Sequence, residues 1–154
     1  MAFDTAWRLL GHAADAEDAA QEAFLDAFEL HQQGAVENWG GLLKVLASRR
    51  AIDRLRKRRP AEATIREPLT SPDHEPEPAA MERELAERLR TAVAQLPDRE
   101  AGVFSLRHFG EMTNPEIADA LGITTDAVGV ALHKARENLR RILNTDRSLN
   151  RRIA

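Results

Sequence analysis

The segment from Thr113 to Arg140 constrains the fold most, because it carries the start signals of two short helices with a glycine between them. Thr113 is a favourable N-cap residue, and Glu116 follows three positions later, as a capping box requires. Pro115 falls in the first helical turn, where its missing N–H group costs little. Gly122 then supplies the turn, and we expect it to have a positive φ.

The second helix of this segment has two contrasting faces. Thr124 or Thr125 caps it, and apolar residues recur along it at helical spacing, so that this stripe must face a core. The stripe consists of Val128, Leu132, Ala135, Leu139 and Ile142. The opposite side is mostly polar and carries Asp126, Val130, His133, Lys134 and Glu137, with Gly129 and Arg136 on its flank. This pattern predicts a helix-turn-helix whose second helix enters a DNA major groove, although helical hairpins that bind no DNA share it.

The composition favours helix along almost the entire chain. Alanine, leucine, arginine and glutamate dominate the 154 residues, and no run alternates like a strand. We therefore expect an all-α protein. The chain has no cysteine, which excludes disulfides and thiolate metal sites. No segment has the length and apolarity of a membrane span or a signal peptide, so we expect a cytoplasmic protein without a membrane partner.

A proline-rich stretch divides the chain. Five prolines fall between residues 60 and 80, among acidic residues, threonine and serine, which predicts an extended linker. We expect two small helical domains at 1–60 and 81–145, a linker at 61–80 and a tail at 146–154.

Apolar spacing predicts the buried faces of these domains. In the first, we expect one helix to end near Gly11, a second to be capped by Asp15, and a third to run from Asn38 or Trp39 to Arg59. The expected inner face of the second helix is Ala20, Phe24, Ala27 and Phe28. In the second domain, the first helix is expected to bury Met81, Leu85, Leu89, Val93 and Leu96.

The net charge of −3 conceals a strong separation of acidic and basic residues along the chain. Residues 1–38 carry eight acidic side chains against one arginine, whereas residues 44–59 carry eight basic side chains against one aspartate. The basic helix is the electrostatic footprint of a nucleic-acid site. The acidic segment suggests a basic protein partner, and we expect it to screen the basic helix in the free protein. Both segments are also compatible with solvated helix faces.

Four motifs in order resemble bacterial sigma factors. They are Asp15-Ala-Glu-Asp-Ala-Ala-Gln-Glu-Ala-Phe24, Arg50-Ala-Ile-Asp-Arg-Leu-Arg56, Leu96-Pro-Asp-Arg-Glu100, and a helix-turn-helix ending in His133-Lys-Ala-Arg136. Across almost the whole chain, the order resembles the extracytoplasmic-function (ECF) class of the sigma-70 family, which has only regions 2 and 4. The resemblance implies promoter recognition, promoter melting and transcription initiation in complex with core RNA polymerase, which does the chemistry.

The resemblance also assigns residues. It implies that Asp18, Gln21 and Glu22 bind the β′ clamp helices of polymerase. It implies that the basic helix binds the −10 element, as duplex and as melted strand, through Arg49, Arg50, Arg54, Arg56 and Lys57. The connection at residues 31–37 then accepts a flipped base. Trp39 either stacks on a base or, as we favour, lies in the core.

In region 4, the resemblance implies contacts with the −35 element by Thr124, Thr125, Asp126, Val130, His133, Lys134 and Arg136. The polymerase β flap would contact apolar residues for which Phe104, Phe109 and Ile142 are candidates. An anti-sigma factor is the expected regulatory partner. No cofactor or metal is implied, since the five histidines show no ligand spacing.

The chain also departs from the family pattern. Gly129 and Ala131 stand where basic or polar residues are common, which predicts weak or unusual −35 recognition. Arg49 and Leu42 stand where the family usually has asparagine and tryptophan, and the chain begins about one helix later. Two alternatives therefore stay open: a helix-turn-helix regulator that acts without polymerase, and a non-initiating decoy that binds polymerase or an anti-sigma factor. No catalytic set points to an enzyme.

Overall fold

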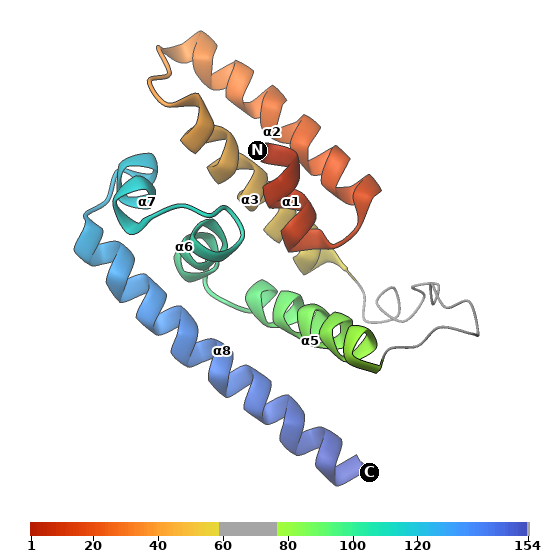
Figure 1. Ribbon diagram of the computed structural model, residues 1–154. Helices are drawn as coiled ribbons and strands as arrows, with labels where there is room; N and C mark the ends of the chain where they lie inside the picture. The colour runs from red at the N-terminus through yellow and green to blue at the C-terminus, as the bar shows by residue number, and fades with distance from the viewer. Residues whose placement is uncertain (59–76, 154) are drawn as a thin grey trace.

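The computed structural model describes residues 1–58 and 77–153, and every regular element in these ranges is an α-helix (Figure 1). The all-α prediction is therefore confirmed. The helices are α1 (Ala2–Leu10), α2 (Ala13–Gln33), α3 (Trp39–Lys57), α5 (Glu77–Ala94), α6 (Asp98–His108), α7 (Asn114–Leu121) and α8 (Thr125–Ile153). Within these ranges, none of the helices combines the length and the apolar character needed to cross a membrane.

The first half of the chain packs α1, α2 and α3 against one another through small side chains. α2 buries a stripe of alanines at positions 16, 19, 20, 23 and 27. Because alanine has a short side chain, this stripe lets the backbones approach closely. The prediction that Phe24 and Phe28 face inward is wrong, since their side chains are 55% and 59% exposed. Helical spacing places the apolar residues of α2 in two adjacent stripes, and the stripe of alanines is the one that is buried.

The ends of the first helices follow local signals only in part. α1 ends as predicted, at Gly11, whose φ of 65° lies in the left-handed region that favours glycine. α2 starts three residues earlier than a cap at Asp15 predicted, with His12 at its N-cap and Asp15 in the first turn. A carboxylate in that position still interacts favourably with the helix dipole.

The second half contains α5 to α8, and its helices are longer than predicted. α5 begins at Glu77, inside the predicted linker, and α8 continues to Ile153, through the predicted tail. Residues 59–76, which contain most of that linker, lie outside the described residues. The buried face of α5 is shorter than predicted, because Val93 and Leu96 are buried but Met81 and Leu85 are exposed.

α3 packs against helices of both halves of the chain. It contacts α1 and α2 on one side and α5, α6 and α7 on the other (Figure 1). Val45 belongs to the core formed by α6, α7 and α8, and Ile52 belongs to the core between α5, α6 and α8. The apolar residues spread around α3 are explained by this double packing.

Candidate nucleic-acid interface

The helix-turn-helix has the local geometry that its sequence predicts. The Thr113 N–H donates to Glu116 Oε1 at 3.1 Å, and the Glu116 N–H donates to Thr113 Oγ1 at 3.3 Å. The backbone N–H of Thr113, and after it the Thr113 side chain, hold the pKa of the Glu116 carboxyl below its ordinary value. Gly122 ends α7 with a φ of 66°. Thr124, rather than Thr125, caps α8, because its Oγ1 accepts a hydrogen bond from the Ala127 N–H at 3.1 Å.

The faces of α8 are separated as predicted. Val128, Leu132, Ala135 and Leu139 are buried, and Ile142 is partly buried against the same core. The −35 candidates are all exposed: Thr124, Thr125, Asp126, Val130, His133, Lys134 and Arg136. Five of them line an open groove that α8 shares with Asn114 at the start of α7. Sequence reasoning missed Asn114, whose buried Oδ1 has no hydrogen-bond partner.

Gly129 and Ala131 occupy different environments, and the prediction that both remove DNA contacts is half wrong. Ala131 is 4% exposed and belongs to the core, so a polar residue there would not reach DNA. Gly129 lines the groove, and a Cβ added to it would meet no atom within 4 Å. Of these two residues, only Gly129 therefore leaves the outer face of α8 without a side chain that could contact DNA.

The basic side chains of α3 are largely engaged by the acidic face of α2. Arg50 donates two hydrogen bonds of 2.7 Å to the carboxylate of Asp26. This bidentate pair lowers the pKa of Asp26 and raises that of Arg50. Arg54 donates to Glu22 Oε1 at 2.6 Å. The expected screening of the basic helix by the acidic segment is thus present as direct ion pairs.

Arg56 is held by the second half of the chain. Its guanidinium donates to the Ala94 carbonyl at 3.1 Å, to the Leu96 carbonyl at 2.8 Å and to Asp98 Oδ1 at 2.6 Å. Arg49 and Lys57 are exposed and have no hydrogen-bonded or ionic partner among the described residues. Of the five −10 candidates, only these two are therefore free to bind phosphate without breaking a contact.

Further contacts join the halves along α1 and α3. The Lys44 Nζ donates to the Gly110 carbonyl at 2.8 Å. Arg8 donates to the Phe109 carbonyl at 3.1 Å and lies 2.9 Å from the carboxylate of Glu111. Charge-assisted bonds to carbonyls are among the stronger polar contacts in proteins. The arrangement of the halves is therefore fixed by polar contacts as well as by the shared core.

The three predicted polymerase-binding residues on the acidic face of α2 are engaged to different degrees. Gln21 is exposed, Asp18 is exposed but lies 4.0 Å from the guanidinium of Arg54, and Glu22 is half-buried and bonded to Arg54. Leu25 and Phe28 lie four and seven residues after Gln21 on the same stripe and are 66% and 59% exposed. The sequence analysis did not predict this exposed apolar surface, and it placed Phe28 in the core.

The aromatic candidates also change. Trp39 is 41% exposed at the start of α3, so the core assignment that we favoured is wrong. Its ring lies 5.3 Å from that of His31, beside the connection predicted to accept a base. α2 extends through residue 33, so this connection is shorter than predicted. Of the β-flap candidates, Phe104 is 7% exposed, and Phe109 and Ile142 are partly buried against the core.

Comparisons with known proteins identify the family of both halves of the chain. Residues 2–61 match the family Sigma-70 region 2, and residues 86–139 match Sigma-70, region 4. The chain is 31% identical to the ECF RNA polymerase sigma factor SigW of Bacillus subtilis, over 92% of this chain and 82% of that protein. It is 28% identical to the RNA polymerase sigma factor YlaC of the same organism, over 94% and 87%.

A third relative comes from a different bacterium. The chain is 29% identical to the ECF RNA polymerase sigma factor RpoE of Cereibacter sphaeroides, over 83% of this chain and 72% of that protein. Sigma factors regulate transcription and are not themselves enzymes. The chain therefore belongs to the ECF sigma factors of the sigma-70 family, which direct promoter recognition and transcription initiation by RNA polymerase.

Proposed function

We propose that three surfaces of this chain divide the sigma-factor activity. The stripe of α2 with Asp18, Gln21 and Glu22 binds the β′ clamp helices. The cations of α3, namely Arg49, Arg50, Arg54, Arg56 and Lys57, bind the −10 element. The outer face of α8, with the seven residues named above, binds the −35 element. The observation that best supports this division is the exposure of all seven −35 candidates on one face of a capped helix-turn-helix.

The α2 surface combines charge with apolar area. Asp18 and Gln21 supply exposed acceptors, and Leu25 and Phe28 continue the stripe with exposed carbon surface. Charges at an interface favour orientation and association rate, whereas buried aromatic anchors supply much of the binding energy. We therefore extend the proposed polymerase-binding surface to Leu25 and Phe28. On the −10 side, exposed Trp39 beside His31 adds a stacking surface for an unpaired base.

The two halves must separate for this division to work. The −10 and −35 elements lie about 25 base pairs apart, which at 3.4 Å per base pair is on the order of 80 Å. In the structure, a Cβ added to Gly41 of α3 would lie 3.5 Å from the Cβ of Ala120 in α7. The 18 residues between the described ranges can span at most about 65 Å, so the dimensions of the halves themselves must supply the rest of the distance between the two elements.

Separation of the halves also changes the contacts of the α3 cations that we propose bind the −10 element. Arg56 leaves the carbonyls of Ala94 and Leu96 and becomes available to phosphate. A partner on the α2 stripe competes with Arg54 for Glu22 and so frees a second cation. Polymerase binding and DNA binding are therefore coupled through residues that pair with each other in the closed arrangement. An anti-sigma factor that covered either surface would block initiation in the cytoplasm.

Co-elution with core polymerase tests the polymerase-binding surface. The purified chain is mixed with bacterial core RNA polymerase and run on a sizing column, together with Asp18→Arg and Glu82→Arg. Glu82 is an exposed carboxylate of α5 with no hydrogen-bonded or ionic partner among the described residues. Glu82→Arg therefore reverses an acidic charge, as Asp18→Arg does, but at a position outside α2. The proposal expects a complex with wild type and with Glu82→Arg, and a reduced one with Asp18→Arg. Equal binding by all three would refute this surface.

A further inference from the structure

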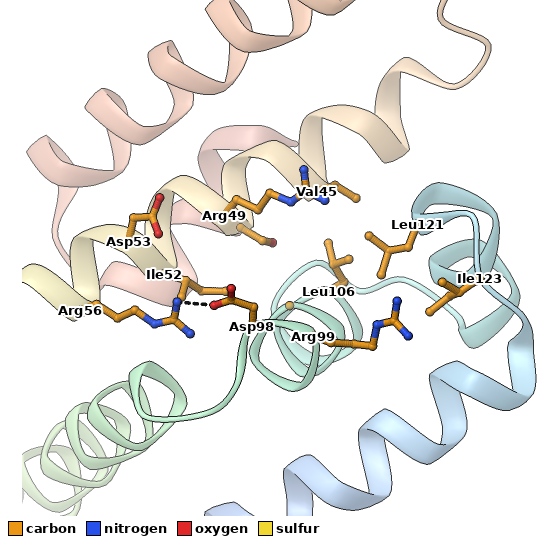
Figure 2. A pocket seen from close by; sticks show the side chains of 12 residues that line it. Val45, Arg49, Ile52, Asp53, Arg56, Asp98, Arg99, Leu106, Leu121 and Ile123 are labelled. Carbon is orange, nitrogen blue, oxygen red and sulfur yellow. Dashed lines mark hydrogen bonds and ion pairs between the residues drawn. The ribbon is translucent and has the colours of Figure 1, made fainter.

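A cavity of about 480 Å³ lies where α3 of the first half meets α6 and α7 of the second (Figure 2). Its apolar lining comes from all three helices and the turn after α7: Val45, Ile52, Leu106, Leu121 and Ile123. Pockets of this size between domains, with an apolar lining and few polar groups, are the usual setting of small-ligand sites. The cavity exists only while the halves are packed together.

One polar group in the wall of the cavity lacks a partner. Ser48 of α3 lines it, is 1% exposed, and its Oγ makes no hydrogen bond. A buried hydroxyl without a partner costs free energy, so native proteins generally satisfy such groups. The Ser48 oxygen itself has almost no accessible surface, so neighbouring side chains separate it from the cavity space.

Two arginines from opposite helices flank the same space. Arg49 of α3 and Arg99 of α6 both extend toward the side where Leu121 and Ile123 lie (Figure 2). Both are exposed, and neither has a hydrogen-bonded or ionic partner in the described part of the chain. At the other end, Arg56 and Asp98 satisfy each other at 2.6 Å. The free charge at the cavity is therefore two guanidinium groups, opposed by the carboxylate of Asp53.

A glycine leaves part of this volume empty. Gly102 of α6 lines the cavity, and a Cβ added there would meet no atom within 4 Å. Glycine inside a helix costs about 1 kcal/mol relative to alanine. A larger side chain at this position would fit the helix and fill the cavity instead of clashing with it.

We propose that this cavity binds a small amphipathic anion: an apolar body with one carboxylate or phosphate group. The body fills the space beside Gly102, Leu106 and Leu121. The anionic group accepts hydrogen bonds from Arg49 and Arg99. Guanidinium groups suit both carboxylates and phosphates, because their donors match paired oxygens. Both head groups present the same chemistry, and the experiment below separates them.

Binding at this position has a regulatory consequence that rests on the proposed function. The anion contacts α3 and α6 at once, so it binds the closed arrangement and not the separated halves. A ligand specific for one state shifts the equilibrium toward that state by the factor 1 + [L]/Kd, about 100-fold at 100 times Kd. The anion also occupies Arg49, one of the two free −10 cations. It therefore opposes promoter binding in two ways.

Calorimetry on the isolated full-length chain tests the site without polymerase or DNA. The probes are octanoate, octyl phosphate and inorganic phosphate. Binding is compared among wild type, Gly102→Leu, Arg99→Gln and the matched controls Gly129→Leu and Arg83→Gln, after circular dichroism has verified each fold. Gly129 is also a helical glycine with open space around it, and Arg83 of α5 is also an exposed arginine.

The proposal expects one octanoate or octyl phosphate per chain, whichever head group fits better, bound at least ten times more weakly by Gly102→Leu and Arg99→Gln. The two controls should bind like wild type. It is overturned if neither amphipathic probe binds, if Gly102→Leu and Arg99→Gln both bind as tightly as wild type, or if inorganic phosphate binds as tightly as octyl phosphate. Because polymerase co-elution is measured separately, failure here leaves the sigma-factor surfaces untouched.

A second readout tests the coupling. Small-angle scattering should show a smaller radius of gyration with saturating probe than without it, and the difference should vanish in Gly102→Leu. An unchanged radius at saturation, where the free protein contains a measurable open fraction, would overturn the claim that the anion holds the halves together.

Discussion

The guanidinium of Arg56 lies 2.6 Å from Asp98 Oδ1, and this pair joins the end of α3 to the start of α6. The same arginine also donates to the carbonyl of Ala94, the last residue of α5, and to that of Leu96, two residues further on. Arg56 is thus a proposed DNA contact that the second half of the chain occupies. This relationship makes the packing of the two halves against each other and the proposed binding of promoter DNA competing uses of one side chain.

Removing Arg56 should open the closed arrangement more than removing Asp98. Asp98 is 90% exposed, so solvent screens its ion pair, and Asp98→Ala should cost the interface less than about 1 kcal/mol. Arg56→Met loses the carbonyl bonds as well, about 1.5–3 kcal/mol each for charged donors. Scattering should give the largest radius of gyration for Arg56→Met. Lys57→Met, next to it on α3, serves as the control, and a radius for Arg56→Met no larger than this control's would contradict the account.

Asp26→Asn should destabilise the protein by about 1 kcal/mol in chemical denaturation, because it removes the bidentate partner of Arg50. The estimate is modest since the Arg50 side chain is 40% exposed. The folded-state pKa of Asp26 is lowered, so its stabilisation is fully present above its unfolded pKa of about 3.9. It is lost as pH falls through the folded value. The difference between wild type and variant should therefore shrink below about pH 4, and a constant difference down to pH 2 would argue against the pair.

The two glycines of the helix-turn-helix should respond oppositely to alanine. Gly129→Ala should raise the free energy of unfolding by about 0.5–1 kcal/mol, because the added Cβ meets no atom and the helix gains a better former. Gly122→Ala should lower it by about 1–2 kcal/mol, because its φ of 66° is unfavourable for a Cβ. Thermal or denaturant unfolding checks both, and a destabilising Gly129→Ala would mean that α8 is packed differently.

Exposed apolar residues of α2 should matter for polymerase and not for folding. Leu25→Ser and Phe28→Ser should each weaken binding to core polymerase by at least tenfold, while the unfolding midpoint changes little. Met81→Ser, at an exposed apolar position of α5, is the control. Fluorescence titration with core polymerase provides the affinities. A large loss of stability without a loss of affinity would instead return these residues to a structural role.

Sequence patterns were most accurate where the determinants are local. The capping box of Thr113 and Glu116, the turn at Gly122 and the stripe of α8 all depend on residues a few positions apart. Phe24 and Phe28 were misplaced because helical periodicity gives the spacing of apolar residues but not which stripe meets a neighbour. The alanine stripe beside them packs against α1 and α3.

Long-range contacts had no signal in a single sequence. The pairing of Arg50 with Asp26 and the capture of Arg56 by α5 and α6 join residues 24 and about 40 positions apart. The motifs therefore predicted residues for each proposed surface, but not that several of these residues pair with each other in the folded chain. The cavity between α3 and α6 could not be predicted either, because residues far apart in the sequence line it.

The most direct test of the account measures the distance between the halves during initiation. The chain has no cysteine, so single cysteines introduced at exposed Glu29 of α2 and Arg140 of α8 can carry a fluorescent donor and acceptor. The account predicts efficient energy transfer in the free protein and a marked decrease when core polymerase and promoter DNA are added and transcript forms. Transcript formation with unchanged energy transfer would contradict the claim that the closed arrangement must open.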